Sequence, residues 1–330
     1  MRRCALALML IAPLWTMQAR AEYAPHGQSR ELSINVNGSE RWTTVYQPPG
    51  YKAGAPVVLL LHGGTQSMRK IFGRNAGGMR QWLAIADREK FLLLIPNATN
   101  VETGDAKGDK QNWNDLRPAN AIGKTAADDV EFLMRLLDWA RDGYHYDAKR
   151  VFVTGSSNGG MMTMRLLIEK PQRFAAAAAI IASLPTSGAS KPAAGPRVPL
   201  MLMNGTLDPL VQWRGGMIRG ERGETMPIEA NLQWWREVNG VASARPRLDT
   251  LPDQDPDDGC RVYRTTWLPD VPAGAPVVFY RLEGGGHSLP SIAHELPAGP
   301  MVRRLIGPTC RDVEGAELVW DFFKHYGAPR

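Results

Sequence analysis

The sequence contains little cysteine, three residues in 330, and no C-x-x-C pair. It therefore offers neither a typical zinc ligand set nor a thiol-redox motif, and we expect no metal and no cofactor. No run of Lys and Arg is interleaved with aromatic residues, so a nucleic-acid partner has no support. Beyond the N-terminal segment, no apolar run approaches the ~20 residues that span a bilayer.

The first 21 residues have the pattern of a secretory signal peptide. Arg2 and Arg3 precede an apolar run, Cys4–Trp15, which is followed by the small-x-small site Ala19-Arg20-Ala21. We expect cleavage before Glu22 and a secreted or periplasmic protein; a retained N-terminal anchor is the alternative. Without the three leader arginines the balance changes from 39 minus 33 to 36 minus 33, so the mature net charge is +3 rather than +6.

Two cysteines, Cys260 and Cys310, remain in the mature chain. An even pair in an oxidising compartment favours a disulfide. Two separate buried thiols are the alternative, because spacing alone does not place their Cα atoms within bonding range.

Continuous apolar runs alternate with helical patterns through the middle of the chain, which predicts a doubly wound, mostly parallel sheet. Asn37-Gly38 lies between two alternating segments and predicts an N-terminal β-hairpin. We expect one α/β domain over residues 22–330, with no membrane span. The predicted strands are Leu32–Val36, Trp42–Tyr46, Val57–Leu61, Phe91–Ile95, Val151–Thr154, Ala175–Ile181, Leu200–Met203, Arg261–Trp267 and Val277–Leu282, and the predicted helices are Met79–Glu89, one opening at Thr125, Asn158–Glu169, Ile228–Val238 and Ala316–Tyr326.

One connection in this pattern is unusually long. The stretch Asn97–Gly123 is rich in Asn, Asp and Gly and has the length of a functional or lid-like loop. Thr125 and Asp128 after it have capping-box spacing, which predicts a helix start at Thr125.

A G-x-S-x-G motif, Gly155-Ser156-Ser157-Asn158-Gly159, lies between a predicted strand and a predicted helix. This is the context in which a sharp turn exposes a nucleophilic serine, here Ser157. Glycines two positions before and after the serine avoid clashes that a Cβ would cause.

A serine nucleophile needs an imidazole base, which a carboxylate orients. In the chain order Ser, acid, His we choose His287, which follows a predicted strand, over His294 in a loop and His325 in the last helix. Asp208 follows the strand Leu200–Met203 and is the candidate acid, with helix capping as its alternative role; Asp249, Asp253, Asp255, Asp257 and Asp258 are more simply assigned to a solvated loop.

Backbone amides must also stabilise the oxyanion of such a reaction. The residue after the nucleophile, Asn158, supplies one N–H, and Gly64, in the loop after Val57–Leu61, is the candidate for the second. We interpret His62 as structural rather than as a metal ligand, because no second His or Cys stands at ligand spacing.

At these residues the chain resembles the secreted polyhydroxybutyrate-depolymerase-like esterases, which are similar to feruloyl and acetylxylan esterases of carbohydrate esterase family 1. The resemblance implies an α/β-hydrolase fold, a Ser157, Asp208, His287 triad, an oxyanion site at Gly64 and Asn158, and hydrolysis of hydroxyacid-polymer or hydroxycinnamoyl-sugar esters. The chain departs from the family at Gly64, where Cys is frequent, at Ser156, where Leu is frequent, and at Leu289, where Trp is common. The matching segments are Leu61-His62-Gly63-Gly64-Thr65-Gln66, Asn112-Trp113-Asn114-Asp115, Asp128-Asp129-Val130, Arg150-Val151-Phe152-Val153-Thr154-Gly155, Ser157-Asn158-Gly159-Gly160-Met161-Met162, Asn204-Gly205-Thr206 with Asp208-Pro209-Leu210-Val211, and Gly285-Gly286-His287.

Substrate preference follows less directly from the residues. The chain shows no linker and no separate polymer-binding domain, so we expect soluble oligomers or small esters rather than insoluble polymer. Trp113 and Trp213 are candidates for binding an aryl or sugar ring, with core packing as the alternative. A peptidase, a thioesterase or an acyltransferase could use the same three residues, and a non-catalytic binding module is the rival of another class.

Overall fold

The computed structural model describes residues 23–73, 76–187, 195–294, 296 and 299–327. The predicted signal peptide therefore lies outside the described residues. Within them, no helix is long and apolar enough to cross a membrane.

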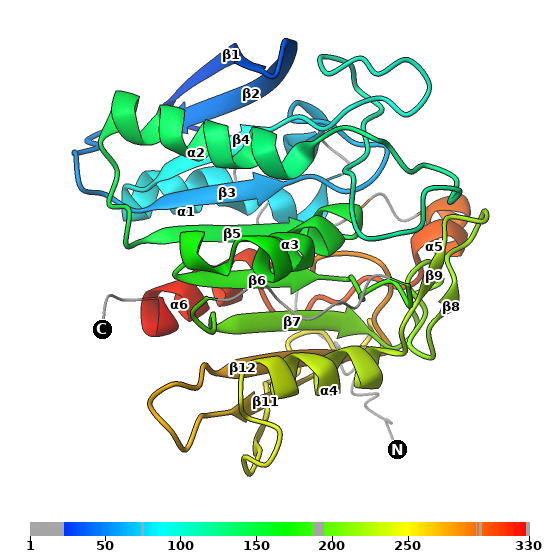
Figure 1. The fold of residues 1–330 in the computed structure, drawn as a ribbon. Helices are drawn as coiled ribbons and strands as arrows, with labels where there is room; N and C mark the ends of the chain where they lie inside the picture. The colour runs from blue at the N-terminus through cyan, green and yellow to red at the C-terminus, as the bar shows by residue number, and fades with distance from the viewer. Residues whose placement is uncertain (1–22, 74–75, 188–194, 295, 297–298, 328–330) are drawn as a thin grey trace, which may run out of the picture.

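A ten-stranded sheet forms the centre of the molecule (Figure 1), in the order β1-β2-β4-β3-β5-β6-β7-β12-β11-β10. The six strands from β4 to β12 in this order are mutually parallel, and antiparallel strands flank them on both sides. The α/β prediction with an N-terminal hairpin is confirmed. The strands are β1 (Gln28–Val36), β2 (Ser39–Gln47), β3 (Val57–Leu61), β4 (Leu92–Pro96), β5 (Val151–Ser156), β6 (Ala176–Ile180), β7 (Leu200–Gly205), β10 (Arg247–Thr250), β11 (Arg261–Trp267) and β12 (Val277–Glu283), and a separate hairpin pairs β8 (Gly216–Met217) with β9 (Glu224–Thr225).

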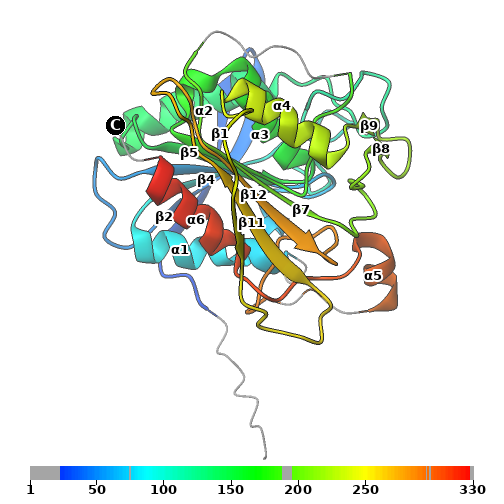
Figure 2. The ribbon, with the colours of Figure 1, turned by 90° about the horizontal axis from the view of Figure 1, so that it is seen from below.

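Helices cover both faces of the sheet, as Figure 2 shows. One face carries α2 (Asp129–Tyr144), α3 (Asn158–Glu169) and α4 (Ile228–Val238), and the other carries α1 (Gln81–Glu89) and α6 (Gly315–Tyr326). A short helix, α5 (Pro300–Ile306), lies beyond the carboxyl ends of the parallel strands.

The continuous apolar strands result from this double cover. In β3, Val57, Leu59 and Leu61 pack into the core beneath α2, α3 and α4, while Val58 and Leu60 pack into the core beneath α1 and α6. Successive side chains of a strand point to opposite faces, so a strand covered on both sides needs apolar residues at every position.

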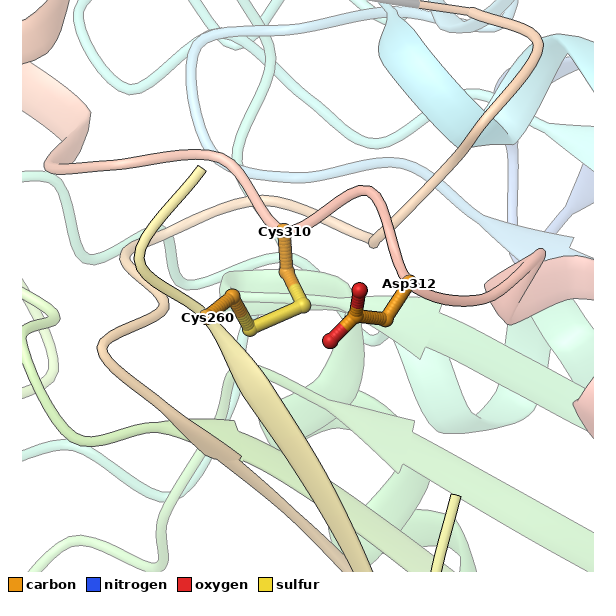
Figure 3. A group of neighbouring side chains, drawn as sticks. All are labelled: Cys260, Cys310 and Asp312. Atoms are coloured by element: carbon orange, nitrogen blue, oxygen red, sulfur yellow. A yellow bond between two sulfur atoms is a disulfide. The ribbon is translucent and has the colours of Figure 1, made fainter. Parts of the chain in front are cut away.

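The predicted disulfide is confirmed. Cys260, immediately before β11, is bonded to Cys310, which lies between α5 and α6 (Figure 3), and both residues are buried. Asp312 lies beside the bond and accepts hydrogen bonds from the backbone N–H groups of Gln254 (2.9 Å) and Asp255 (3.2 Å). The long polar loop before β11 is thus attached to the segment before α6.

The predicted start of α2 is wrong by four residues. The helix begins at Asp129, and the side chain of Asp128 caps it by accepting from the N–H of Glu131 (3.1 Å). Thr125 is buried, and its hydroxyl is instead hydrogen-bonded to the hydroxyl of Thr99 (2.8 Å). The threonine therefore closes the long loop rather than opening the helix.

Asp249 is also misplaced by the sequence analysis. It belongs to the edge strand β10, where its carboxyl group accepts from the guanidinium of Arg264 (2.9 Å) on β11. Three of the four residues of β10 are exposed, so the strand lacks the apolar alternation that makes a strand recognisable.

Candidate active site

Ser157 occupies the turn between β5 and α3. Its backbone has φ 55° and ψ −120°, a conformation that residues with a Cβ rarely adopt. The turn is held on both sides, since the N–H of Ser157 donates to Ile180 O (2.9 Å) and the Ser157 carbonyl accepts from Met161 N–H (2.9 Å). The predicted strand, turn and helix around Ser157 are therefore present.

The glycines of the motif permit this turn to lie against its neighbours. A Cβ on Gly155 would stand 2.5 Å from the backbone of Gly159, and a Cβ on Gly159 would stand 2.5 Å from the carbonyl oxygens of Leu61 and His62. Such distances are far below ordinary contact, so both positions require glycine.

Asp208 and His287 form a hydrogen-bonded pair. The Nδ1–H of His287 donates to Oδ2 of Asp208 (2.7 Å), and both side chains are almost completely buried. Oδ1 of Asp208 accepts from the N–H groups of Leu210 (2.8 Å) and Val211 (2.9 Å). The carboxyl group thus caps a turn with one oxygen and holds the imidazole with the other; no helix begins at Asp208, so the alternative of helix capping does not describe it.

The loop that carries His287 pairs with the last residue of α5 and with the segment after it. Gly286 N–H donates to Pro308 O (2.7 Å), and His287 N–H donates to Ile306 O. A Cβ on Gly286 would stand 2.3 Å from Ile306 O, so the glycine allows the two segments to meet. The end of α5 therefore fixes the backbone of the candidate base.

The two predicted oxyanion residues are neighbours. A Cβ built on Gly64 would lie 3.4 Å from the Cβ of Asn158 and 2.8 Å from Oδ1 of Asn112. The side chain of Asn112, which accepts from Thr65 N–H (3.0 Å), takes the space that a larger residue at position 64 would need. This loop after β3 and the amino terminus of α3 thus meet beside Ser157.

His62 supports the loop from beneath. It is completely buried; Nδ1 donates to Gly63 O (2.8 Å), and Nε2 accepts from Ala98 N–H (3.2 Å). Burial lowers the pKa of His62 to about 4, so the ring is neutral near pH 7. Both nitrogens are occupied by protein groups, which agrees with a structural histidine.

A cavity of about 990 Å³ lies over these residues. Gly64, Ser157, Asn158 and His287 all line it, and Asp208 reaches it through His287. The structure therefore brings the five predicted residues of the triad and the oxyanion site together at one place, beyond the carboxyl ends of the parallel strands.

The structure does not bring the two predicted tryptophans to this cavity. Trp113 is fully buried, and its indole N–H donates to His62 O (2.9 Å). Trp213 packs against Phe279, with 6.0 Å between ring centroids, and neither residue is among the described residues that line the cavity. Core packing, the alternative considered for both, describes their positions.

Part of the cavity wall comes from elements that the sequence analysis did not predict. Val302 and Ile306 of α5 and Ile218 and Arg222 of the β8–β9 connection line it. These elements are short, and only the Gly-rich composition around residues 215–223 marks the second as a loop, so no periodicity revealed them.

A metal-ligand cluster is not formed at the cavity by the described residues. The one group of three candidate ligands among them is Cys260, Cys310 and Asp312, and the two sulfur atoms of that group are bonded to each other.

Comparison with known proteins agrees with this geometry. Residues 34–266 match the family described as "Putative esterase". The curated protein "Putative esterase NocK" of Nocardia uniformis subsp. tsuyamanensis is 26% identical over 301 residues, which cover 88% of this chain and 80% of that protein. Poly(3-hydroxyalkanoate) depolymerase C of Paucimonas lemoignei is 31% identical over 175 residues, which cover 53% of this chain and 38% of the depolymerase.

The fold has solved counterparts. The acetyl xylan esterase from Aspergillus awamori superposes with a TM-score of 0.55 at 15% identity, covering 84% of this chain and 98% of that one. Seven other curated relatives, among them the depolymerase, are matched over only 28% to 47% of their own length.

The match to the "Putative esterase" family extends over more than half of the residues of this chain. The chain therefore belongs to this esterase family.

Proposed function

We propose that the protein is a secreted or periplasmic serine esterase that hydrolyses carboxylic esters through an acyl-serine intermediate. The observation that carries the proposal is the Asp208–His287 hydrogen bond (2.7 Å) at the cavity that the strained residue Ser157 also lines. A nucleophile, a base and an orienting carboxyl group are the parts that this chemistry needs.

In the acylation step, Ser157 Oγ attacks the ester carbonyl carbon while Nε2 of His287 takes the hydroxyl proton. Asp208 holds the other ring nitrogen, which keeps Nε2 free as the acceptor and stabilises the imidazolium that forms. The C–O bond of the ester then breaks, and the imidazolium returns its proton to the leaving alcohol.

Negative charge develops on the carbonyl oxygen during this step. The backbone N–H groups of Gly64 and Asn158 are the proposed donors, since both residues border the cavity beside Ser157. The loss of one such donor typically lowers kcat by about 10² to 10³. Water, activated by the same imidazole, then attacks the acyl-serine and releases the acid.

The cavity wall and the relatives support a proposal for the substrate class. Apolar residues such as Met161, Leu210 and Ile218 line the cavity together with polar residues such as Gln66 and Asn100. Such a mixed wall suits an acyl chain or ring that carries oxygen groups. We infer hydroxyalkanoate oligomers or hydroxycinnamoyl or acetyl esters of sugars as substrates, in keeping with the depolymerase and the acetyl xylan esterase among the relatives.

An oxidising compartment is part of the same proposal. The disulfide between Cys260 and Cys310 is of the kind that persists in secreted and periplasmic proteins. The pattern of residues 1–21 supports export independently.

The role of Ser157 as the nucleophile is tested by its substitution. The wild-type protein should hydrolyse p-nitrophenyl butyrate, and Ser157→Ala should lower kcat by at least about 10³ because the covalent route is lost. Initial rates and circular dichroism of both proteins measure this. A folded Ser157→Ala protein with wild-type turnover would contradict the role of Ser157, and an inactive wild type would favour the binding module.

A substrate panel then separates the enzyme classes. Methyl ferulate, acetylated xylo-oligosaccharides, hydroxybutyrate oligomers, acyl thioesters and peptides are compared by kcat/KM. We expect one of the oxygen esters to have the highest kcat/KM. A peptide or a thioester as the best substrate would replace the proposed esterase by the corresponding hydrolase.

A further inference from the structure

The mechanism leaves one buried carboxyl group near Ser157 unused. Asp115 lies in the loop between β4 and α2, and its side chain is completely buried. It is neither a triad member nor a residue that lines the cavity. A carboxyl group removed from water is costly unless its partners compensate for the loss, so its contacts indicate its purpose.

One of these contacts is with the residue after the nucleophile. Nδ2 of Asn158 donates to Oδ2 of Asp115 (2.6 Å) and to Trp113 O (3.1 Å). Oδ1 of Asn158 accepts from Trp113 N–H (2.7 Å). Both amide hydrogens and the amide oxygen of Asn158 are therefore engaged, and the side chain is held in one orientation.

The remaining partners of Asp115 are cationic. Nε of Arg117 donates to both carboxyl oxygens (2.8 and 3.0 Å), and Nζ of Lys124 lies 3.8 Å from Oδ1. Arg117 is also buried, and it donates onward to the carbonyl oxygen of Arg222 (2.9 Å) on the β8–β9 connection. Asp115 is thus fixed between the cavity rim and the start of α3.

The contacts of Asp115 and Trp113 with the Asn158 side chain form a clamp. This clamp affects the backbone N–H of Asn158, the proposed oxyanion donor. The direction of the Asn158 N–H depends on the peptide plane between Ser157 and Asn158, and that plane turns with ψ of Ser157 and φ of Asn158. The Ser157 carbonyl, which belongs to this plane, accepts from Met161 N–H (2.9 Å), but an unfavourable backbone conformation such as that of Ser157 persists only where several contacts hold it. When the Asn158 side chain is anchored, the backbone angle φ of Asn158 is restricted, and the direction of its N–H is restricted with it.

We propose that Asp115 is a positioning residue of the oxyanion site, which fixes Asn158 so that its N–H points at the developing oxyanion. The inference rests on the proposed function. It assigns to a buried charge outside the cavity an effect on the transition state rather than on substrate binding.

A matched comparison residue stands at the first position of α2, where the loop ends. Asp129 is also completely buried; it accepts from Asn114 N–H (2.6 Å) and forms an ion pair with Arg41, so it anchors the same loop. It makes none of the contacts with Asn158. Asp129→Asn therefore weakens the anchoring of the loop without touching the clamp, whereas Asp115→Asn does both.

The experiment compares these two variants on p-nitrophenyl butyrate and on a trifluoromethyl ketone inhibitor, which forms an oxyanion adduct with serine. Asp115→Asn should lower kcat about tenfold, a part of the loss expected for a missing donor, with KM within about twofold. Its Ki for the ketone should rise by the factor by which kcat/KM falls. Asp129→Asn should keep the wild-type kcat and Ki even if its melting temperature falls.

Asn158→Ala tests the clamp from the other side, because it keeps the backbone N–H and the Asp115–Arg117 ion pair. It should show the same tenfold loss, and the double variant with Asp115→Asn should lose no more than Asn158→Ala alone. If Asp115→Asn does not fold, wild-type kcat and Ki in Asn158→Ala still overturn the inference.

Several results would overturn the inference. They are wild-type kcat and Ki in Asp115→Asn or Asn158→Ala, an equal loss in Asp129→Asn, or additive losses in the double variant. An inactive wild type would contradict the proposed function itself, and turnover by the wild type together with full turnover by Asp115→Asn would contradict only the role of Asp115.

Discussion

His62 joins the end of β3 to the start of the long loop through its hydrogen bond with Ala98 N–H, and its other ring nitrogen is hydrogen-bonded to the carbonyl of the neighbouring Gly63. Its pKa of about 4 in the folded protein lies below the ordinary value of 6.5, because burial disfavours the charged ring. Between these pH values the unfolded chain binds a proton that the folded chain does not. The contribution of His62 to stability is therefore complete above pH 6.5 and falls as the pH decreases toward 4.

His62→Gln should reduce this pH dependence, although it lowers stability at pH 7. The free energy of unfolding of the wild type should fall by about 3 kcal/mol more than that of the variant between pH 6.5 and pH 4. Urea titrations at a series of pH values measure the difference. His26→Gln, at an exposed position, is the matched control, and parallel curves for the wild type and His62→Gln would contradict the argument.

The positions of the proposed triad residues could be predicted because each residue follows a recognisable strand. Ser157, Asp208 and His287 come after β5, β7 and β12, three strands whose carboxyl ends lie at one edge of the sheet. Asp115 could not be assigned in the same way. Its partners include Asn158 and Lys124, and only the folded path of a loop without periodicity brings them together.

Among the elements, the segment from α5 to α6 supports His287, the proposed base. Ile306 O and Pro308 O accept from the His287 loop, Cys310 O accepts from Ser291 N–H (3.2 Å), and the disulfide ties this segment to β11. The disulfide therefore restrains the backbone segment to which the His287 loop is hydrogen-bonded.

The double substitution Cys260→Ser and Cys310→Ser should weaken both the fold and the activity. A cross-link over 50 residues is worth about 4 kcal/mol when the unfolded chain is restrained. We expect a lower free energy of unfolding and a lower kcat, measured by denaturant titration and ester hydrolysis. Dithiothreitol should lower the free energy of unfolding and the kcat of the wild type but not those of the double variant. An unchanged free energy of unfolding in the double variant would show that the disulfide does not stabilise the fold.

The central elements were predictable and the rim elements were not. Strands β3, β4 and β6 are apolar throughout, and β5 and β7 begin with apolar residues, because helices cover both faces of these strands. The edge strand β10 and the helix α5 have mostly exposed side chains and contain few residues, so neither a period of two nor a period of 3.6 develops.

At the scale of the whole molecule, the disulfide suggests an oxidising compartment, and export is the proposed route to it. The purified protein from a host with a secretory pathway should begin at Glu22, and it should contain no free thiol after unfolding. Intact-mass measurement and thiol titration test both points, with cytoplasmic protein as the comparison. A mature chain that still begins at Met1 would favour a retained anchor.

The walls of the cavity are joined to one another as well as to the sheet. Ile122 N–H donates to Glu221 O (3.0 Å), and the Arg117 side chain connects the Arg222 carbonyl with Asp115. A remodelled entrance that admits a bulkier ester will therefore disturb the backbone beside the nucleophile. In laboratory evolution of this scaffold, selectivity and turnover should change together, and compensating substitutions should gather around Asp115 rather than in the sheet.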